Sequence, residues 1–476
     1  MKKSNWLIFV LVAIAQFMVV LDNAITNVAL PSIQRNLHFT SSSLQWVVTA
    51  YALCFGGFLL LGGRAADLFG RRRMLLIGMI AFTVFSFLIG VSHSPFQLIA
   101  LRGLQGISAA FMSPAALSIV LVTFRDGLER GRALGYWTLV ATGGAAIGML
   151  LGGVLTQYLG WRWNFFINVP VGIVMSFLIA RFVPTHEREE KRTSMDLPGA
   201  TLVTAALMSF VFAFSQAPSW GWTSGRTLGI LAGAAALLAG FIFNESRARH
   251  PLMPLSIFKI RNVTGGNLIM APVYAGMMGV FFLTTLYLQG ILHYSPVVTG
   301  LSFLPFPLVL GFTSTRIPKL VAKYGFRRFL IAGPLLVAAA VLWLSRLQVG
   351  TSYLEGLLPA FILMPIGMGM TFMPTIAAAT SGVPAHEAGL ASGLISTSQQ
   401  MGGALGLAIL SGVAASATAS NLHLGVAAAT VHGYSVAFMV SAAFMLVAAA
   451  VAIGVIRQKA KVPGTNAARV AAAAGH

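Results

Sequence analysis

Asp22 lies deep inside a hydrophobic stretch and is the only charged residue between Trp6 and Gln34. An ionised carboxylate in hydrocarbon costs several kcal/mol unless it faces a partner or a water-filled path. A helix that begins at Trp6 would carry Asp22 roughly 24 Å along its axis, at about 1.5 Å per residue, past the middle of a bilayer. A carboxyl group there can take up a proton on one side and release it on the other. We therefore interpret Asp22 as a proton or cation site; the alternative is a permanently paired structural carboxylate.

Arg102 is the one basic residue that falls within a predicted membrane span. Its guanidinium needs an internal partner or water, and its planar fork suits hydrogen bonds to the helix that carries Asp22. The sequence does not show whether the two residues touch. Because Arg102 falls near the start of its span, anchoring at a helix end is the alternative.

Metal and enzyme chemistry find little support in the sequence. Cys54 is the single cysteine, which excludes disulfides within the chain and thiolate metal sites, and the nine histidines lie apart without a phosphate-binding loop. We expect no cofactor, no metal site and no enzyme activity, with a proton gradient as the energy source.

The composition is that of a membrane protein, because 57% of the residues are hydrophobic and 9% are charged, against about 25% charged in a soluble domain. Long stretches lack Asp, Glu, Lys and Arg, and none alternates as membrane β-strands do. The runs 262–315 and 388–456 are each long enough for two helices. We predict an all-α polytopic membrane protein with 14 transmembrane helices; the other runs are 6–34, 36–63, 74–101, 103–124, 133–161, 163–180, 197–225, 227–244, 329–345 and 356–386.

The net charge of +20 follows the predicted topology rather than a nucleic-acid partner. Of the 31 Lys and Arg, four fall outside (Arg35, Arg162, Arg226 and Arg346), Arg102 lies within a span, and the remaining 26 fall on the side of both termini. This bias predicts that both termini are cytoplasmic. The first apolar run continues to about Leu30, which is too long for a cleaved signal peptide.

Three sequence matches in the same order indicate an internal repeat. Segment 129–135 matches 387–393, segment 69–75 matches 324–330, and 112–114 pairs loosely with 372–374. We expect two parallel six-helix bundles joined through an extra helix pair. The predicted boundaries are 1–194 for the first bundle with its cytoplasmic linker, 195–250 for the two extra helices, 251–461 for the second bundle and 462–476 for a disordered cytoplasmic tail.

A short cytoplasmic turn after Asp67 combines an acid, a glycine and three arginines. The acid can cap a helix N-terminus in one conformation and pair with arginine in another, which would make the turn a gate. The alternative is that the arginines only anchor the inner leaflet. Ala322 occupies the matching position in the second half, so we expect an asymmetric gate. The gating candidates are Gly63, Asp67, Gly70, Arg71, Arg72 and Arg73.

Two further groups of residues are candidates for packing and for substrate. Glycines four or five residues apart make a smooth face for close helix contact; they are Gly143, Gly144, Gly148, Gly152 and Gly153. Aromatic, methionine and amide side chains suit a polyspecific apolar cavity. The substrate-binding candidates are Asn23, Asn27, Gln45, Trp46, Tyr51, Gln105, Tyr274, Met277, Phe281, Phe282, Tyr287, Gln289, Phe303 and Phe306.

Several motifs together resemble the major facilitator superfamily, and within it the fourteen-helix drug:proton antiporter family. They are Leu21-Asp22-Asn23-Ala24-Ile25-Thr26-Asn27-Val28-Ala29-Leu30-Pro31, Gly63 to Arg73, Leu101-Arg102-Gly103-Leu104-Gln105-Gly106, Gly160 to Pro170, and Gly403-Ala404-Leu405-Gly406. Leu68 stands where a basic residue is usual in the loop signature, and Met149 stands where the antiporter signature usually has proline.

The resemblance implies proton-coupled export of hydrophobic compounds by a multi-pass protein of the bacterial cytoplasmic (inner) membrane. Because no acid other than Asp22 falls inside a central span, we expect the exported compounds to be neutral or monocationic. It implies a monomer surrounded by the lipid bilayer, with an adaptor protein as a further partner where export crosses an outer membrane. Two alternatives stay open at this point. One is a dedicated exporter of a single metabolite or antibiotic, and the other is a membrane sensor or lipid-handling protein that does not transport.

Overall fold

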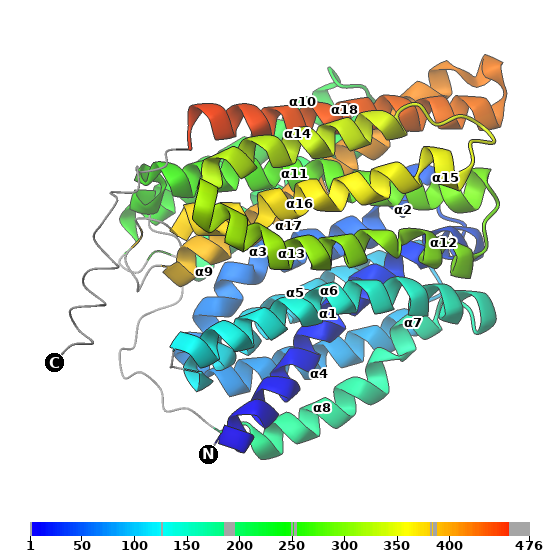
Figure 1. The fold of residues 1–476 in the computed structure, drawn as a ribbon. Coiled ribbons are helices and arrows are strands. Elements are labelled where there is room, and N and C mark those ends of the chain that lie inside the picture. Colours follow the sequence, from blue (N-terminus) through cyan, green and yellow to red (C-terminus); the bar gives the residue numbers. More distant parts are fainter. Residues whose placement is uncertain are drawn as a thin grey trace.

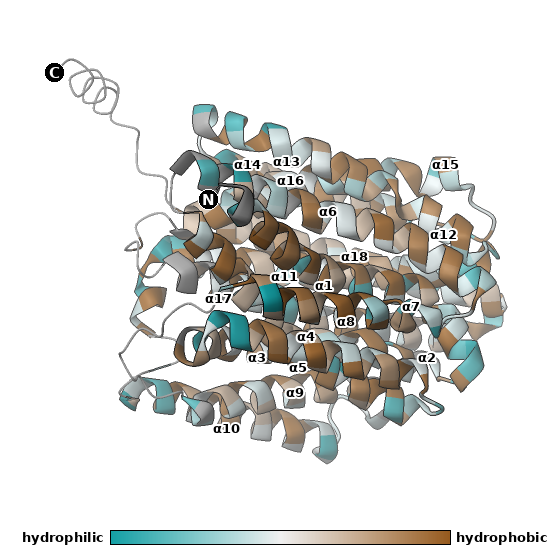
Figure 2. Cartoon of the chain, turned by 90° about the horizontal axis from the view of Figure 1, so that it is seen from below, coloured by the Kyte–Doolittle hydropathy of each residue, from teal (hydrophilic) through white to brown (hydrophobic). Residues whose placement is uncertain are grey.

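The computed structural model describes residues 2–124, 127–184, 196–248, 251, 255–380, 383 and 388–456. Every element of this part of the chain is helical, and the long helices run roughly side by side (Figure 1). Hydrophobic residues cover much of their length, while hydrophilic residues gather toward the two ends (Figure 2). The expected tail 462–476 and most of the linker before Asp196 lie outside the described residues.

The first part of the chain forms six membrane helices. They are α1 (Lys2–Leu37), α3 (Trp46–Phe69), α4 (Arg71–Gly90), α5 (Pro95–Thr123), α6 (Gly127–Tyr158) and α8 (Asn168–Phe182), with the single turns α2 (Ser41–Leu44) and α7 (Trp163–Phe166) between them. Two extra helices, α9 (Leu197–Trp220) and α10 (Gly225–Arg247), follow. α9 packs against α10, α3 and α17.

The second part of the chain repeats the arrangement. Its elements are η1 (Leu255–Lys259), α11 (Arg261–Leu286), the π-helical turn η2 (Tyr287–Ile291), α12 (Pro296–Phe303), α13 (Pro305–Tyr324), α14 (Phe326–Leu344), α15 (Tyr353–Gly356), α16 (Leu358–Thr380), α17 (Ala388–Ser420), η3 (Leu422–Leu424) and α18 (Val426–Gly454). Thirteen stretches of the described chain are long and apolar enough to cross a membrane, and α9 supplies the fourteenth helix with the shorter apolar stretch Pro198–Phe214. The prediction of 14 membrane helices is thereby confirmed.

The internal repeat is visible in the helix pairings. α1 packs on α6, α3 and α4 pack on α5, and α4 packs on α8; in the second half α11 packs on α17, α13 and α14 pack on α16, and α14 packs on α18. The match between 69–75 and 324–330 also has a shared geometry. Gly70 (φ 98°) and Gly325 (φ 83°) precede α4 and α14 in a backbone conformation that side chains disfavour. Two bundles therefore share one design, while the exact domain boundaries stay a prediction.

An arginine closes each of these repeated turns. Arg72 Nη2 donates to the Ala180 carbonyl in the last turn of α8, and Arg327 Nη2 donates to the Ile453 carbonyl in the last turn of α18 (2.8 Å). Carbonyls at a helix C-terminus lack partners within the helix and carry the negative end of its dipole, so a guanidinium stabilises them. The charge of these loops thus has a structural use beside membrane anchoring.

The two bundles contact each other along α3 and α17, from Gln45 and Ser411 at one end to Leu60 and Gly393 nearer the other, and also between α6 and α12. The near end of the molecule carries the start of α1 and the end of α18, and the far end carries α2, α7, α12 and α15 (Figure 1). Three glutamine side chains make hydrogen bonds between the bundles in the far half, and we call these the glutamine contacts. They join Gln45 to Ser411 Oγ (2.5 Å), Gln289 to the Val28 carbonyl (2.8 Å) and Gln157 to the Val297 amide (3.2 Å).

The glycines of α6 divide between two partners. A Cβ on Gly148 would lie 2.7 Å from Ala24 Cβ, and a Cβ on Gly152 would lie 2.7 Å from Ile25 Cα, so both glycines face α1 around Asp22. Gly144 also faces α1, whereas Gly153 faces the start of α12 and Gly143 has no atom within 4 Å of a would-be Cβ. Four of the five glycines therefore allow close helix contact, and Met149 in the usual proline position does not prevent it.

This packing predicts opposite effects of the same substitution at two positions of α6. Gly152→Ala should lower the melting temperature, because overpacking against backbone costs about 1–3 kcal/mol. Gly143→Ala, which meets open space, should leave it unchanged or raise it, because alanine favours helix by about 1 kcal/mol over glycine. Thermal unfolding of the purified variants in detergent measures both. Equal melting temperatures would mean that α1 and α6 do not depend on this contact.

Candidate functional site

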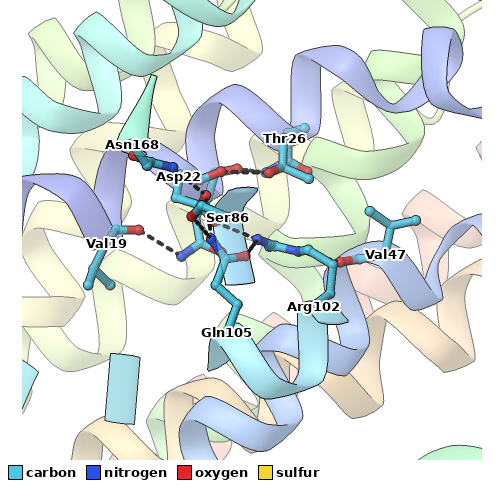
Figure 3. A network of polar contacts seen from close by, with 10 residues as sticks. Val19, Asp22, Thr26, Val47, Ser86, Arg102, Gln105 and Asn168 are labelled. Atoms are coloured by element: carbon cyan, nitrogen blue, oxygen red, sulfur yellow. Dashed lines mark hydrogen bonds and ion pairs between the residues drawn. The ribbon is translucent and has the colours of Figure 1, made fainter. Parts of the chain in front are cut away.

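Asp22 is completely buried on α1 and is held by three side chains from two other helices (Figure 3). Its Oδ2 accepts a hydrogen bond from Arg102 Nη1 at 2.5 Å. Its Oδ1 accepts from Gln105 Nε2 and from Asn168 Nδ2, each at 3.0 Å. The carboxylate therefore meets one positive charge and two amide donors away from water.

Arg102 is equally buried, and its remaining contacts fix the plane of its guanidinium. Nε donates to the Val47 carbonyl of α3 at 3.0 Å, and Nη1 also donates to Gln105 Oε1 at 2.6 Å. Cζ lies 4.3 Å from the centroid of the Tyr51 ring, which adds a cation–π contact. Arg102 therefore does not act as an anchor at the helix end, which was the alternative interpretation of its position.

The spacing within the fourth-helix motif explains how α5 builds this site. Arg102 and Gln105 are three residues apart, so they project from the same face of the helix. Gly106, on the side toward α3, would place a Cβ 2.4 Å from the Tyr51 carbonyl oxygen. Glycine thus lets α5 approach α3 closely enough for Arg102 to reach Val47 and Asp22. A further bond from Gln105 Nε2 to Ser86 Oγ (2.8 Å) ties the cluster to α4.

This arrangement can act as a charge switch. A proton bound to Asp22 would remove the counter-charge of Arg102, and a buried charge without a partner is strongly destabilising. Two protonation states of Asp22 would then favour different packings of α1, α5 and α8. Within the described residues no group of three His, Cys, Asp or Glu side chains could hold a metal ion.

The predicted substrate residues of the first half fall into two groups. Tyr51 and Gln105 belong to the Asp22 cluster, and Asn23 and Asn27 lie half-buried on α1, each donating to a carbonyl one turn back. Gln45 is one of the glutamine contacts. Trp46 stacks at 6.2 Å on Phe212 of the extra helix α9, away from the cluster.

The predicted substrate residues of the second half lie on or beside α11. Phe281 is half-buried and contacts Phe303 and Phe306 with ring centroids 5.6 and 4.9 Å apart. Tyr274 is also half-buried, while Met277, Phe282 and Tyr287 are buried in the hydrophobic core. Gln289 reaches across to α1. A role in substrate binding stays a prediction for all of them.

The gating residues lie toward the near end of the molecule, on the side opposite the glutamine contacts. Gly63 faces Pro114, Gly70 begins the turn, and Arg71 to Arg73 form the first turn of α4. The side chain of Asp67 lies outside the described residues, so the ion-pair latch stays a prediction.

The comparison with known families decides the class of this protein. Residues 12–407 match the family described as Major Facilitator Superfamily. The chain belongs to this superfamily.

Its relatives in the superfamily include drug and antibiotic exporters. It is 42% identical over 457 residues to the puromycin resistance protein pur8 of Streptomyces alboniger, covering 94% of this chain and 90% of that protein. It is 41% identical to the cephamycin export protein CmcT of Amycolatopsis lactamdurans over 92% of this chain and 90% of that protein. It is 35% identical to the multidrug resistance protein Stp of Mycobacterium tuberculosis over 87% of this chain and 77% of that protein. The predicted likeness to fourteen-helix drug exporters is confirmed.

Solved structures agree on the fold. A bacterial homolog of the human lysosomal transporter Spinster superposes with a TM-score of 0.67 at 15% identity, covering 95% of this chain and 97% of that chain. The POT family transporter PepTSo superposes with a TM-score of 0.68 at 16% identity, covering 95% of this chain and 99% of that chain. The superfamily match makes the protein a multi-pass secondary transporter rather than an enzyme, and these structures support its fold.

Sequence reasoning missed two members of the Asp22 cluster. Asn168 and Ser86 bond to Asp22 and Gln105, respectively, yet neither received a role beforehand. Asn168 stands in the motif from Gly160 to Pro170, where an amide within an apolar stretch was an available signal. Ser86 offered none, because single serines are common in membrane helices and bond to their own backbone.

The buried pair predicts a recovery of stability in a double variant. Arg102→Leu leaves the carboxylate of Asp22 without its counter-charge and should lose about 3–5 kcal/mol of stability. Adding Asp22→Asn removes the stranded charge and should recover part of that loss, measured as the melting temperature in detergent. Arg346→Leu, at an exposed position of the far end, is the control and should melt like the wild type. A double variant that melts at or below Arg102→Leu would contradict a charge-paired cluster.

Proposed function

We propose that this transporter exports hydrophobic small molecules, neutral or monocationic, from the cytoplasm in exchange for protons. The observation that carries the proposal is the buried Asp22–Arg102 pair on α1 and α5. A permanent pair of this kind is weak evidence for stability, since its desolvation offsets most of its attraction. In a transporter that must bind and release a proton, the carboxylate of such a pair can serve as the proton-binding group.

The printed names of the relatives support the choice of cargo. They describe resistance to puromycin, export of cephamycin and multidrug resistance, respectively. A carboxylate on a central helix would favour a monocationic or neutral compound, and the half-buried aromatic side chains around Phe281 suit apolar rings.

The proposed cycle uses two conformations. With both termini cytoplasmic, the near end faces the cytoplasm, and the glutamine contacts hold the far side together. In the inward-facing state of the cycle an ionised Asp22 favours the substrate. In the outward-facing state a proton from outside neutralises Asp22, the substrate leaves, and the protonated carrier returns. Coupling requires only that the proton and the substrate stabilise different states.

We assign the control of these states to the turn from Gly63 to Arg73. Arg72 contacts the end of α8, so its bond can form and break as α4 and α8 separate at the near end. Arg327 makes the equivalent bond in the second half, while Ala322 replaces the acid there. The proposed gate therefore has an acid in the first half only, whereas both halves have the arginine.

Proton coupling is tested in inside-out vesicles with a fluorescent hydrophobic monocation. Collapsing the proton gradient should stop uptake by the wild type. Asp22→Asn should abolish gradient-driven uptake while the protein still reaches the membrane, because the amide cannot carry a proton. Asp22→Glu should keep part of the activity, since it still titrates with the carboxyl displaced by one methylene. Full gradient-driven uptake by Asp22→Asn would remove Asp22 from the coupling mechanism.

Substrate charge provides a second test. Asp22 lies in the middle of a membrane helix. Of the other acids among the described side chains, Glu355 is exposed near the far end, and Asp196 and Glu245 belong to the extra pair α9–α10. A dication would bring one more uncompensated charge into the low-dielectric site than a monocation, at a cost of several kcal/mol. Matched mono- and divalent dyes should therefore differ, with the divalent dye transported poorly. Equal transport would show that another acid or water reaches the bound substrate.

A dedicated exporter of one antibiotic is the second candidate function. It is favoured by the names of two relatives, each of which mentions a single compound. A panel of unrelated hydrophobic compounds separates the two candidates, because a dedicated exporter protects cells against one chemical class and a multidrug exporter against several.

A further inference from the structure

Two buried amide oxygens lack a donor, one on Asn168, which contacts Asp22, and one on Asn164, one helical turn away. Asn164 and Asn168 are 0% and 1% exposed, and neither Asn164 Oδ1 nor Asn168 Oδ1 has a hydrogen-bond partner in the part of the chain that the structure describes. Arg102 Nη2 in the same cluster is likewise buried without an acceptor among those residues. Buried polar atoms without protein partners commonly bind ordered water.

The positions of the two asparagines place their oxygens on one path. Asn164 and Asn168 are four residues apart, and Ile167 between α7 and α8 keeps a helical conformation (φ −59°, ψ −29°), so both side chains share one helix face. Side chains with this spacing have Cβ atoms about 5–6 Å apart, a gap that one water spans with two hydrogen bonds.

The other ends of these amides show where the path leads. Asn168 Nδ2 donates to Asp22 Oδ1 at 3.0 Å, while Asn164 Nδ2 donates to Thr156 Oγ1 of α6 at 2.7 Å. One helical turn farther, Trp161 Nε1 and Arg162 Nη1 both donate to Asn36 Oδ1 at the far end. Asn36 is exposed. Within the first bundle, polar groups thus lie beside Asp22 (Asn168), one turn farther (Asn164 and Thr156) and at the far surface (Asn36), and the buried Trp161 ring stands before the last of them.

We propose that Asn164 and Asn168 hold water between α1, α6 and α8, and that this water carries protons from the far end to Asp22. The inference rests on the proposed function, because it supplies the proton that the antiport cycle uses. It separates two routes: the substrate moves between the bundles, and the proton moves inside the first bundle.

The transfer along this route is balanced and needs no other reactant. A hydronium ion at the far end passes a proton to the bound water, which passes one to the Asp22 carboxylate. The products are water and a neutral carboxyl group. The amides accept hydrogen bonds from the water throughout and neither gain nor lose a proton. Arg102 keeps its charge and loses its counter-charge, which is the signal that the packing change requires.

The test compares two kinds of transport in proteoliposomes that contain the purified protein and a fluorescent hydrophobic monocation. Transport driven by a pH gradient needs proton delivery to Asp22. Exchange of labelled for unlabelled substrate at equal pH needs the substrate route alone. Asn164→Leu removes the oxygen and fills the space with methyl groups, whereas Asn164→Ser retains an oxygen and leaves room for water.

We expect Asn164→Leu to slow gradient-driven transport about tenfold, equivalent to roughly 1.4 kcal/mol in a barrier, and to leave substrate exchange unchanged. Asn164→Ser should transport at close to the wild-type rate. The matched control is Asn421→Leu, since Asn421 follows α17 in the second bundle and its Nδ2 donates to the Ala417 carbonyl in the last turn of that helix. Where Asn164→Leu lowers the melting temperature, the smaller Asn164→Val variant gives the same comparison.

Three outcomes would overturn the inference. Wild-type gradient-driven transport by Asn164→Leu would mean that protons reach Asp22 by another route. Equal loss of exchange and of gradient-driven transport would assign Asn164 to packing. Loss in Asn164→Ser equal to that in Asn164→Leu would exclude water as the ligand. A wild type that transports without any response to the pH gradient would instead remove the proposed function itself.

Discussion

The ion pair between Asp22 and Arg102 is the interaction on which the first bundle depends. Two full charges inside a membrane are tolerated only if they pair with each other and if hydrogen bonds satisfy their remaining donors and acceptors. Four elements are arranged to meet this requirement: α1 supplies the acid, α5 the base and an amide, α3 a carbonyl and an aromatic face, and α8 a second amide. Any movement of one helix against the others changes the solvation of the pair.

Small residues make this arrangement reachable. Membrane helices are not driven together by the hydrophobic effect, so close backbone approach is what brings them into contact. Gly148 and Gly152 allow α6 to approach the backbone of α1 closely around Asp22, and Gly106 allows α5 to approach α3 closely beside Arg102. The glycines are therefore part of the charge site, although they carry no chemistry themselves.

Much of the fold could be predicted from the sequence because the constraints of a bilayer are simple. Charge-free runs predicted the helices, and each of the two longest runs is divided into two membrane spans as expected, by the turn after Ile291 and by the turn from Asn421 to Gly425. The equivalence of Arg72 and Arg327 was likewise readable as a short repeat. Prolines were poor guides to helix ends, since Pro31, Pro114 and Pro272 lie inside helices and are accommodated there.

The site was predictable only in part. Asp22 and Arg102 could be singled out because a lone charge in an apolar run is costly, but their contact could not, since it depends on how four helices rotate about their axes. Asn168 and Ser86 needed the same three-dimensional information. The residues that face substrate are harder still, because aromatic and amide side chains occur on lipid-facing, interhelical and central faces alike.

The glutamine contacts have a consequence for how the two bundles part. All three are neutral amide hydrogen bonds, each worth about 1 kcal/mol net, and none of them is an ion pair. Dissolved ions screen charges with a Debye length of about 8 Å at physiological ionic strength, but they act little on neutral amides. In the proposed orientation the far end lies on the outer face of the membrane, where the ionic strength is that of the medium. The free energy of opening this part of the contact between the bundles should therefore change little with salt.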